Sequence, residues 1–548
     1  MMGGMSMSRP GGRRRRGVAG LTVSAAALAA LTGLTACTSP GTAATTPSSP
    51  ASASAQPGST QTGTAQIGGS IVPAHSTLHW HSCSGQLAQE RIPDCTTLSV
   101  PLNYADPSGR HIILALDMVP ATAPVSQQQG ILLFNPGGPG GSGLPWPAAV
   151  ASGLSPSVAA DYDIVGFDPR GVGSSVPALS CDPGFFSGLQ PNFIPANAAA
   201  ERVLINRAKT YAHDCEQKFG WLLPYMTTRA VARDMDSIRA AFGVSQINYY
   251  AFSYGTYLGQ VYATLFPSRV RRMVLDSTVD PTGVWYADNV DQDYAFQGRL
   301  EAFFAWVAKY DSTYQLGSTT AQVQASWYRA RNQLLAHPVN GTIGADDFDF
   351  TFLASGYEDE LWPGLAQALS AYLNAGQTAA MVAQYEGNGT QNENEFAVYN
   401  AVQCADVDWP RSFAYWTSDT ELVYKTAPFQ AWDNAWFNAA CAFWPVKGPA
   451  EPLQIKGAGL PPILMLQGTL DPATPYAGAQ DAHKLLPSAR MVVVVGGGNH
   501  GQSLEQPSNS CVEGYLNAYL GTGALPQAPG LTNATCPAVP APTPGSSQ

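Results

Sequence analysis

Short, mainly apolar runs alternate with segments of helical periodicity along most of the chain. The short runs are typical of buried strands, whereas apolar residues recurring at three and four positions predict helices such as 230–241 and 254–265. Alternating strands and helices favour a mostly parallel sheet covered on both faces, which is the α/β fold class. The predicted strands are 112–118, 131–134, 163–167, 247–250, 273–275, 463–466 and 491–495.

This alternation stops between the strands at 273–275 and 463–466, which about 190 residues separate. The gap is too long for one crossover connection, and its apolar spacing is helical. We therefore expect a helical cap inserted at 283–445, over the carboxyl-terminal edge of the sheet, where ligands bind in open α/β folds. The cap divides the predicted core into residues 78–282 and 446–536, and we expect it to set substrate choice.

Both ends of the chain have compositions that cannot bury a core. Residues 38–70 consist almost wholly of Ser, Thr, Ala, Pro, Gly and Gln, so a disordered tether is predicted over 37–77. The tail 537–548, rich in Pro, Ala and Ser, is predicted to be disordered as well.

The first residues have the pattern of an export signal, with arginines at 13–16 followed by an apolar stretch. Leu34-Thr35-Ala36-Cys37 resembles the lipobox of bacterial lipoproteins, which implies a signal peptide at 1–36 and a lipid on Cys37. The alternative is an ordinary secretory signal with an incidental cysteine, and the arginines also leave a twin-arginine export route open. We therefore expect an exported protein, either lipid-anchored on the outer side of the cell membrane or secreted.

The cysteine count agrees with export, because eight of the nine cysteines remain when Cys37 is set aside. Eight cysteines in an exported chain predict four disulfides. Their order suggests pairing between neighbours, and the absence of a C-x-x-C spacing argues against a zinc or redox site. The expected pairs are Cys83 with Cys95, Cys181 with Cys215, Cys404 with Cys441, and Cys511 with Cys536.

The net charge of the chain indicates which classes of binding partner are unfavourable. The formal net charge is -11, yet residues 1–36 carry five arginines and no acid, which leaves 23 basic and 39 acidic residues in the rest of the chain. Such an acidic body argues against nucleic acid and anionic membrane surfaces as partners. Contact with the membrane is expected only through a lipid anchor at Cys37, and the protein is expected to be a monomer.

Ser253 is the candidate nucleophile. It lies in Ala251-Phe252-Ser253-Tyr254-Gly255, between the strand at 247–250 and a helical pattern, as in the G-x-S-x-G nucleophile turn. Positions two before and two after the serine must be small, because strand and helix approach closely there, and Ala251 and Gly255 meet this requirement. A serine in an ordinary turn is the alternative. Whether Ser253 is a nucleophile therefore depends on whether the rest of the chain supplies a base and an acid.

A base and an acid follow in the chain order Ser, Asp, His that this arrangement requires. Asp471 comes just after the strand at 463–466, and His500 lies on a glycine loop after the strand at 491–495. Asp276, at the end of the strand at 273–275, is the competing acid. We prefer Asp471, because it directly precedes the His strand and Asp276 can equally cap a turn.

Acyl transfer also needs hydrogen-bond donors for the developing oxyanion. The segment 135–143 is glycine-rich and directly follows the strand at 131–134. We assign the N–H of Gly138, with Gly137 as the neighbouring possibility, and the N–H of Tyr254; each such donor contributes about 3 to 4 kcal/mol to the transition state. A phosphate-binding loop is disfavoured, since the segment lacks the Lys-Ser/Thr ending.

Four motifs follow one another along the chain: Asn-Pro-Gly-Gly-Pro-Gly-Gly-Ser-Gly from Asn135, Asp-Pro-Arg-Gly-Val-Gly-Ser-Ser from Asp168, Ser-Tyr-Gly-Thr from Ser253 and Gly-Thr-Leu-Asp-Pro from Gly468. Together they resemble those of the secreted tripeptidyl aminopeptidases of actinobacteria, which are α/β-hydrolases related to prolyl iminopeptidases. The resemblance extends from about Cys83 to Cys511 and implies a serine exopeptidase that releases short peptides from free N-termini, without a metal or organic cofactor. The departure is Ala251 in place of glycine, beside the bulky Phe252, which affects the fine shape of the turn.

An aminopeptidase must also bind a cationic N-terminus, preferably with carboxylates in a partly dry pocket. We expect Glu358, Glu360 and Asp406 to supply this anchor, and a solvated acidic face is the alternative for each of them.

The sequence thus predicts an exported serine exopeptidase that removes di- or tripeptides from peptide N-termini through an acyl-enzyme. One alternative keeps the same three residues but acts on hydrophobic esters or amides. The other is an inactive lipoprotein that binds peptides, against which the complete set of catalytic residues argues.

Overall fold

The computed structural model describes residues 66–67, 70–71, 77–89 and 92–545. The predicted signal peptide, Cys37 and most of the predicted tether lie outside the described residues. Among the residues described, no helix is long and apolar enough to cross a membrane.

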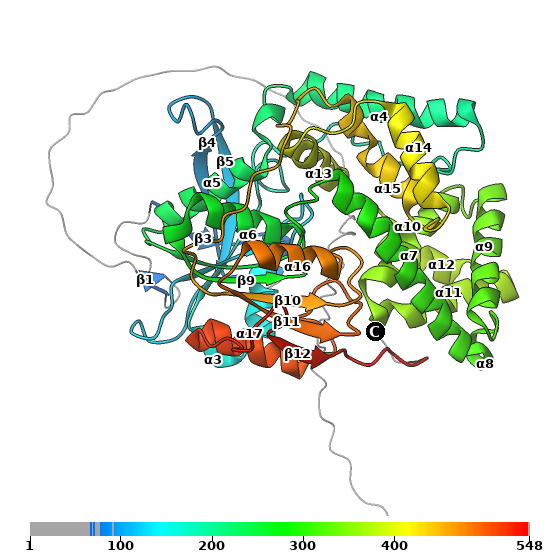
Figure 1. The fold of residues 1–548 in the computed structure, drawn as a ribbon. Helices are drawn as coiled ribbons and strands as arrows, with labels where there is room; N and C mark the ends of the chain where they lie inside the picture. Colours follow the sequence, from blue (N-terminus) through cyan, green and yellow to red (C-terminus); the bar gives the residue numbers. More distant parts are fainter. Residues whose placement is uncertain (1–65, 68–69, 72–76, 90–91, 546–548) are drawn as a thin grey trace, which may run out of the picture.

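The described chain is built on a ten-stranded sheet of order β12-β11-β10-β9-β8-β6-β7-β5-β4-β3 (Figure 1). Neighbouring strands from β7 through β12 pair in parallel, and β3, β4 and β5 extend the sheet antiparallel at one edge. The α/β class with a mostly parallel sheet is therefore confirmed. The strands are β3 (His81–Ser82), β4 (Asp94–Pro101), β5 (His111–Val119), β6 (Ile131–Asn135), β7 (Asp163–Phe167), β8 (Ile247–Phe252), β9 (Val270–Asp276), β10 (Ile463–Gly468), β11 (Ala489–Val495) and β12 (Ala534–Pro537).

Helices cover both faces of this sheet, which explains why its central strands are mainly apolar. Every residue of β8 is buried, and its side chains alternate between two cores. Tyr249 and Ala251 face one core, whereas Tyr250 and Phe252 face the other. The first core is completed by α5 (Thr228–Ala241), α6 (Tyr254–Leu265) and α16 (Tyr476–Leu485), and the second by α2 (Trp146–Gly153), α3 (Pro156–Ala160) and α17 (Ser510–Thr522).

A helical region lies beside the sheet, at the right and top of Figure 1, between β9 and β10 in the chain. Its aromatic core is separate and includes Phe303, Trp327, Phe352 and Trp362. The α-helices of this cap are α7 (Tyr286–Lys309), α8 (Asp311–Tyr314), α9 (Thr320–Ala336), α10 (Ala345–Tyr357), α11 (Trp362–Ala375), α12 (Ala379–Gln384), α13 (Glu393–Asp406), α14 (Phe413–Tyr424) and α15 (Ala431–Asn438).

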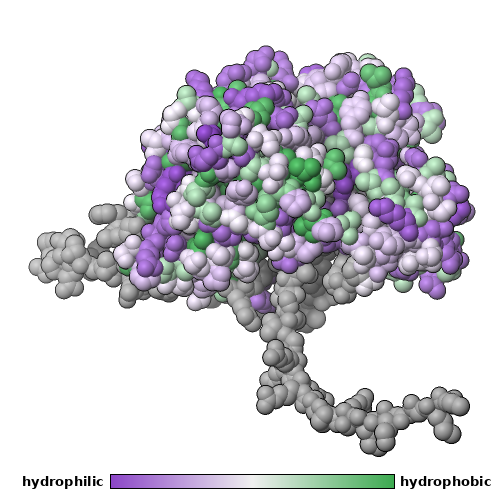
Figure 2. Space-filling view, turned by 60° about the horizontal axis from the view of Figure 1, so that its bottom comes forward, coloured by the Kyte–Doolittle hydropathy of each residue, from purple (hydrophilic) through white to green (hydrophobic). Residues whose placement is uncertain are grey.

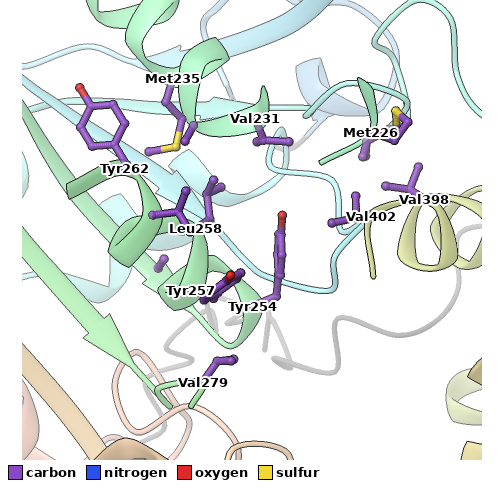
Figure 3. Packing of buried hydrophobic residues seen from close by; sticks show 14 of the residues in the cluster. Met226, Val231, Met235, Tyr254, Tyr257, Leu258, Tyr262, Val279, Val398 and Val402 are labelled. Atoms are coloured by element: carbon purple, nitrogen blue, oxygen red, sulfur yellow. The ribbon is translucent and has the colours of Figure 1, made fainter. Parts of the chain in front are cut away.

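Two features tie the cap to the rest of the chain. Helix α4 (Ala198–Phe219), which comes before β8, packs Leu204 and Ala208 against Trp432 and Trp436 of α15. Cap helix α13 places Val398 and Val402 in the same core as α5 and α6, as Figure 3 shows. The cap is therefore continuous with the sheet region on one side.

The four predicted disulfides are confirmed: Cys83–Cys95, Cys181–Cys215, Cys404–Cys441 and Cys511–Cys536. The second links the segment after β7 to α4, and the third holds α13 to the turn that follows α15. Since disulfides persist in oxidising compartments, this framework agrees with an exported protein.

The first residues of the predicted tail are described and are held by the fold. Pro537 ends β12, and the carbonyl oxygen of Pro542 accepts a hydrogen bond of 2.8 Å from the indole N–H of Trp306. The structure therefore differs from the expected disorder for the part of the tail up to residue 545. Composition alone does not reveal the hydrogen-bond donor on the cap helix that this part of the tail contacts.

Candidate active site

Ser253 lies on a sharp turn between the last residue of β8 and the first residue of α6. Its φ of 55° and ψ of -131° place a non-glycine residue in a region that costs about 1 to 3 kcal/mol. The surrounding backbone holds it there: the Ser253 N–H donates to the Asp276 carbonyl at 3.2 Å, and the Ser253 carbonyl accepts from the Thr256 N–H at 2.8 Å. Such a strained turn exposes a serine hydroxyl at the end of a strand.

Close packing explains the small residues on either side of Ser253. A Cβ on Gly255 would lie 2.7 Å from the carbonyl oxygen of Asn135 and 2.8 Å from the Cβ of Ala251. The turn therefore accepts alanine at position 251 only because position 255 carries no side chain. Gly137 is similarly constrained, since a Cβ there would lie 2.8 Å from the Cβ of Ser253.

The glycine loop after β6 approaches this turn. Gly137 and Gly138 have φ values of 113° and 106°, which favour glycine, and the N–H of Gly137 donates to the side-chain oxygen of Asn135 at 3.1 Å. Gly138 lines the same cavity as Ser253 and Tyr254. Tyr254 is the first residue of α6, so its N–H has no partner within the helix. These two amides are the candidate oxyanion donors.

His500 and Asp471 lie in contact, as predicted from their positions after β11 and β10. The Nδ1 atom of His500 is 3.0 Å and 3.2 Å from the two carboxylate oxygens of Asp471. The carboxylate also accepts hydrogen bonds from the N–H groups of Ala473 and Thr474 and from the Thr474 hydroxyl, each at 3.0 Å. With Nδ1–H donated to Asp471, Nε2 of His500 remains as a proton acceptor.

Asp276, the competing acid, has a different position. Its carboxylate accepts hydrogen bonds from the N–H groups of Gln502 at 2.9 Å and Ser503 at 3.0 Å, and from the Ser503 hydroxyl. It is fully buried, and burial raises its pKa to about 7. Asp276 thus braces the loop that follows His500, and the geometry favours Asp471 as the acid.

Ser253, His500 and Gly138 open on one cavity of about 600 Å³. Because the cap covers the carboxyl-terminal ends of the strands, aromatic residues of the cap and of the α4 region form much of the wall. They include Phe185, Phe186, Phe193, Tyr357, Phe396, Tyr399, Trp436 and Phe437. The contribution of the segment around α4 was not predicted, since it comes before the nucleophile in the chain.

The carboxylates chosen from the sequence as amine ligands do not reach this cavity: among its described lining residues, Glu358, Glu360 and Asp406 are absent. Asp406 accepts from the N–H and hydroxyl of Thr228, at 2.8 Å and 2.5 Å, and so holds the first turn of α5. Glu360 accepts from the Asn499 side chain at 3.3 Å. Glu358 is buried, and burial of Glu505, followed by the charge of Glu358, raises the pKa of Glu505. We correct the prediction accordingly: Asp406 holds the backbone of α5, and Glu358 and Glu360 lie outside the cavity lining.

Another carboxylate, Glu395, does line the cavity. It belongs to α13, and its backbone lies against the glycine loop, since a Cβ on Gly140 would be 2.7 Å from the Glu395 carbonyl oxygen. Burial is the cause of a rise in the pKa of Glu395 to about 8, and among the described residues no cation is paired with it. Sequence reasoning missed Glu395 because no motif flanks it.

The chain matches the family model described as alpha/beta hydrolase fold over residues 130–506. It is 41% identical over 463 residues to the "Tripeptidyl aminopeptidase" of Streptomyces lividans, covering 82% of this chain and 85% of that protein. It is 32% identical over 477 residues to the "Serine protease Hip1" of Mycobacterium tuberculosis, and the match covers 82% of this chain and 89% of that protein. A third relative, the "Carboxylesterase B" of the same species, is 32% identical over 484 residues, and the match covers 85% of this chain and 91% of that protein.

Proposed function

On the premise that this chain belongs to the α/β-hydrolase family, and within it to the tripeptidyl aminopeptidases, we propose that it is an exported serine exopeptidase. It releases di- or tripeptides from free peptide N-termini through an acyl-enzyme. The observation that carries this proposal is the position of Glu395, an unpaired carboxylate on the wall of the cavity that also holds Ser253 and His500.

In this mechanism the Ser253 hydroxyl attacks the scissile carbonyl while Nε2 of His500 takes its proton. Asp471 holds His500 in the required tautomer and stabilises the imidazolium that forms. The N–H groups of Gly138 and Tyr254 donate to the oxyanion of the tetrahedral intermediate. His500 then gives its proton to the leaving amine, and a water activated by His500 hydrolyses the acyl-enzyme to release the short peptide.

The charges along the cavity support a cationic substrate. Its described lining carries one arginine, Arg207, and seven carboxylates: Asp280, Asp288, Asp291, Asp346, Asp347, Glu395 and Asp433. A concave site lined mainly by one sign of charge concentrates ligands of the other sign. A peptide with a free α-ammonium group fits this field better than its acetylated form or a neutral ester.

Glu395 is the proposed anchor for that ammonium group. A carboxylate that is desolvated and lacks a cation gains most from a charged ligand, because their attraction strengthens as water leaves. The backbone of Glu395 lies against the loop at Gly140, and Glu395 lines the same cavity as the proposed oxyanion donors. An anchored amine therefore lies a short length of peptide from Ser253, which limits the size of the released fragment.

The test is hydrolysis of matched aminomethylcoumarin substrates with one, two and three residues, each with a free or an acetylated N-terminus. Wild type should cleave free-amine substrates, and Ser253→Ala should not. Glu395→Gln should lower kcat/KM for free-amine substrates about 10- to 100-fold, the size expected when a charge-assisted hydrogen bond is lost. Hydrolysis of acetylated peptides should change little, and an equal loss for both substrate classes would contradict the role of Glu395.

A carboxylesterase is the second candidate. The relative of that name aligns with 85% of this chain, and the same three residues can hydrolyse esters. The aromatic wall of the cavity would suit hydrophobic acyl groups. Ser253-dependent turnover of esters, without cleavage of any free-amine peptide in the same assay, would favour this candidate.

We further propose that the protein acts as a monomer attached to the outer side of the membrane by a lipid on Cys37. On the face shown in Figure 2, hydrophobic residues occur in small groups among hydrophilic ones, so this face offers no large apolar area for a permanent partner. Mass spectrometry of the N-terminal peptide of protein purified from membranes should show a lipidated Cys37. Unmodified protein found only in the medium would contradict the anchor.

A further inference from the structure

Three carboxylates from two cap helices meet at the wall of the cavity. Asp346 and Asp349 lie one turn apart on α10, and Asp433 lies on α15. One oxygen from each lies within 4.8 Å of the others. The residues are only 3%, 2% and 8% exposed, and buried carboxylates are costly unless cations or hydrogen bonds satisfy them.

Arg331 is the only cation in direct contact with this cluster among the described residues. Its Nε donates to one oxygen of Asp349 at 2.7 Å, and its Nη2 is 3.8 Å from Asp346. The second arginine nearby, Arg207, donates instead to the Phe185 carbonyl and to the Gln190 side chain. Three carboxylates and one guanidinium leave a net charge of -2 when all are ionised.

The hydrogen bonds do not satisfy the cluster either. Asp346 accepts from the N–H of Phe193 at 2.8 Å, but the second oxygen of Asp349 is buried without a hydrogen-bond partner. For the side chain of Asp433, no hydrogen bond from another described residue is found. A buried oxygen without a hydrogen-bond partner thus belongs to a cluster of three carboxylates that lie within 4.8 Å of one another, which is an arrangement suited to a cation.

The donor set indicates which cation. Calcium takes six to eight oxygen ligands at about 2.3 to 2.6 Å, so two ligands on opposite sides of one ion lie about 4.6 to 5.2 Å apart. The spacing of the cluster falls within that limit. Zinc is less suited, because it favours His and Cys ligands. Asp346 and Asp433 line the cavity, so water can complete the coordination and the ion can enter.

We propose that Asp346, Asp349 and Asp433 bind one calcium ion at the wall of the substrate cavity. The charge of the ion balances the net charge of the cluster, and it takes no part in bond cleavage. Its site joins the first turn of α10 to α15. Because α10 ends at Tyr357, whose carbonyl oxygen accepts from the His500 N–H at 2.9 Å, the ion steadies the helix that supports the proposed base.

The experiment uses the whole exported chain after treatment with a chelator. Addition of CaCl₂ at constant ionic strength should raise the Tm, and calorimetry should give a Kd of about 10⁻⁴ to 10⁻³ M, the range of extracellular calcium modules. Terbium, a calcium substitute, should show luminescence excited through tryptophan, since Trp432 adjoins Asp433 in α15. Calcium should displace the terbium signal.

Variants locate the site. Asp349→Asn and Asp433→Asn should abolish the calcium-dependent rise in Tm, whereas Asp291→Asn, an acid of the cavity lining on α7, should keep it. If both cluster variants fail to fold, terbium displacement by calcium in the wild type decides. The proposal is overturned if calcium up to about 10 mM, tenfold above the expected range, leaves the Tm unchanged. It also fails if Asp291→Asn loses the response equally, or if a free-amine peptide displaces terbium and calcium does not.

Discussion

The carbonyl oxygen of Tyr357 accepts a hydrogen bond from the backbone N–H of His500 at 2.9 Å, and the two rings meet edge to face with centroids 5.5 Å apart. The end of a cap helix thus contacts the residue proposed as general base. The cap lines the proposed substrate cavity and also positions the proposed base, so changes to the cap are expected to affect kcat as well as KM.

The ring of Tyr357 provides the first test of this dual role. Tyr357→Ala should lower kcat about 10- to 100-fold, since small displacements of a reacting group have effects of this size. Tyr357→Phe keeps the ring and should retain the wild-type kcat. Steady-state kinetics with a free-amine peptide, together with the rate of fluorophosphonate labelling of Ser253, measure the effect. A wild-type kcat in Tyr357→Ala would show that the ring does not position His500.

The two buried acids should respond differently to substitution. Asp471→Asn is expected to lower kcat about 10⁴-fold with a small change in Tm, because it disturbs the tautomer of His500. Asp276→Asn should mainly lower the Tm, since its carboxylate accepts three hydrogen bonds from the loop after His500. Kinetics and calorimetry on both variants are needed. A large loss of kcat at unchanged Tm in Asp276→Asn alone would reverse the assignment of the acid.

The high pKa of Glu395 predicts a characteristic pH profile. Amine binding needs an ionised Glu395, whose pKa is about 8, and a protonated α-amine, whose pKa is about 7.7 to 8.0. The ratio of kcat/KM for free-amine over acetylated peptides cancels the titration of the other catalytic groups. This ratio should rise toward pH 8 and fall above it, and Glu395→Gln should flatten its rising limb. A ratio independent of pH in the wild type would count against the anchor.

The same shift predicts how stability depends on pH. Because the folded pKa of Glu395 lies above its unfolded value, the folded state retains a proton that the unfolded chain has already released between about pH 4.5 and 8. The Glu395 contribution to the free energy of unfolding therefore falls as pH rises through that window. Urea unfolding at several pH values should show a shallower decline for Glu395→Gln than for wild type. Identical slopes would mean that Glu395 titrates normally.

The turn at Ser253 predicts opposite tolerance at two small residues. Gly255→Ala places a Cβ 2.7 Å from the Asn135 carbonyl oxygen, and such overpacking costs about 1 to 3 kcal/mol. We expect a lower Tm and a lower kcat, because the overlap moves the turn that carries Ser253. Ala251→Gly removes a methyl group and should preserve most activity. Thermal unfolding and kinetics of the pair provide the comparison, and equal tolerance at both positions would contradict the packing argument.

The sequence predicted the sheet and the residues Ser253, Asp471 and His500 because each lies directly after a strand. Parallel strands bring their carboxyl ends to one edge, so the order of motifs in the chain is enough to predict that these residues lie at that edge. In the structure His500 contacts Asp471, and His500 and Ser253 line one cavity. The pairing of eight cysteines could be predicted from their order for a related reason, since each disulfide closes a local loop of 12 to 37 residues.

The amine anchor could not be predicted in the same way. Glu395 reaches the cavity through the packing of α13 on the glycine loop at Gly140, a contact between segments more than 250 residues apart. The acids chosen from the sequence, such as Asp406, are equally acidic and equally close to apolar residues. The hydrogen bond that Asp406 accepts from the Thr228 N–H depends on tertiary structure that a local pattern does not encode.

The shared core of α13, α5 and α6 has a consequence for how specificity can change in proteins of this design. Because Val398 and Val402 are packed among side chains of the sheet region, the cap cannot be exchanged between relatives as an independent module. A transplanted cap would bring mismatched apolar surfaces into the centre of the molecule. Replacements of residues that line the cavity leave this shared core intact, so we expect them to change substrate preference with less loss of stability than exchange of the whole cap.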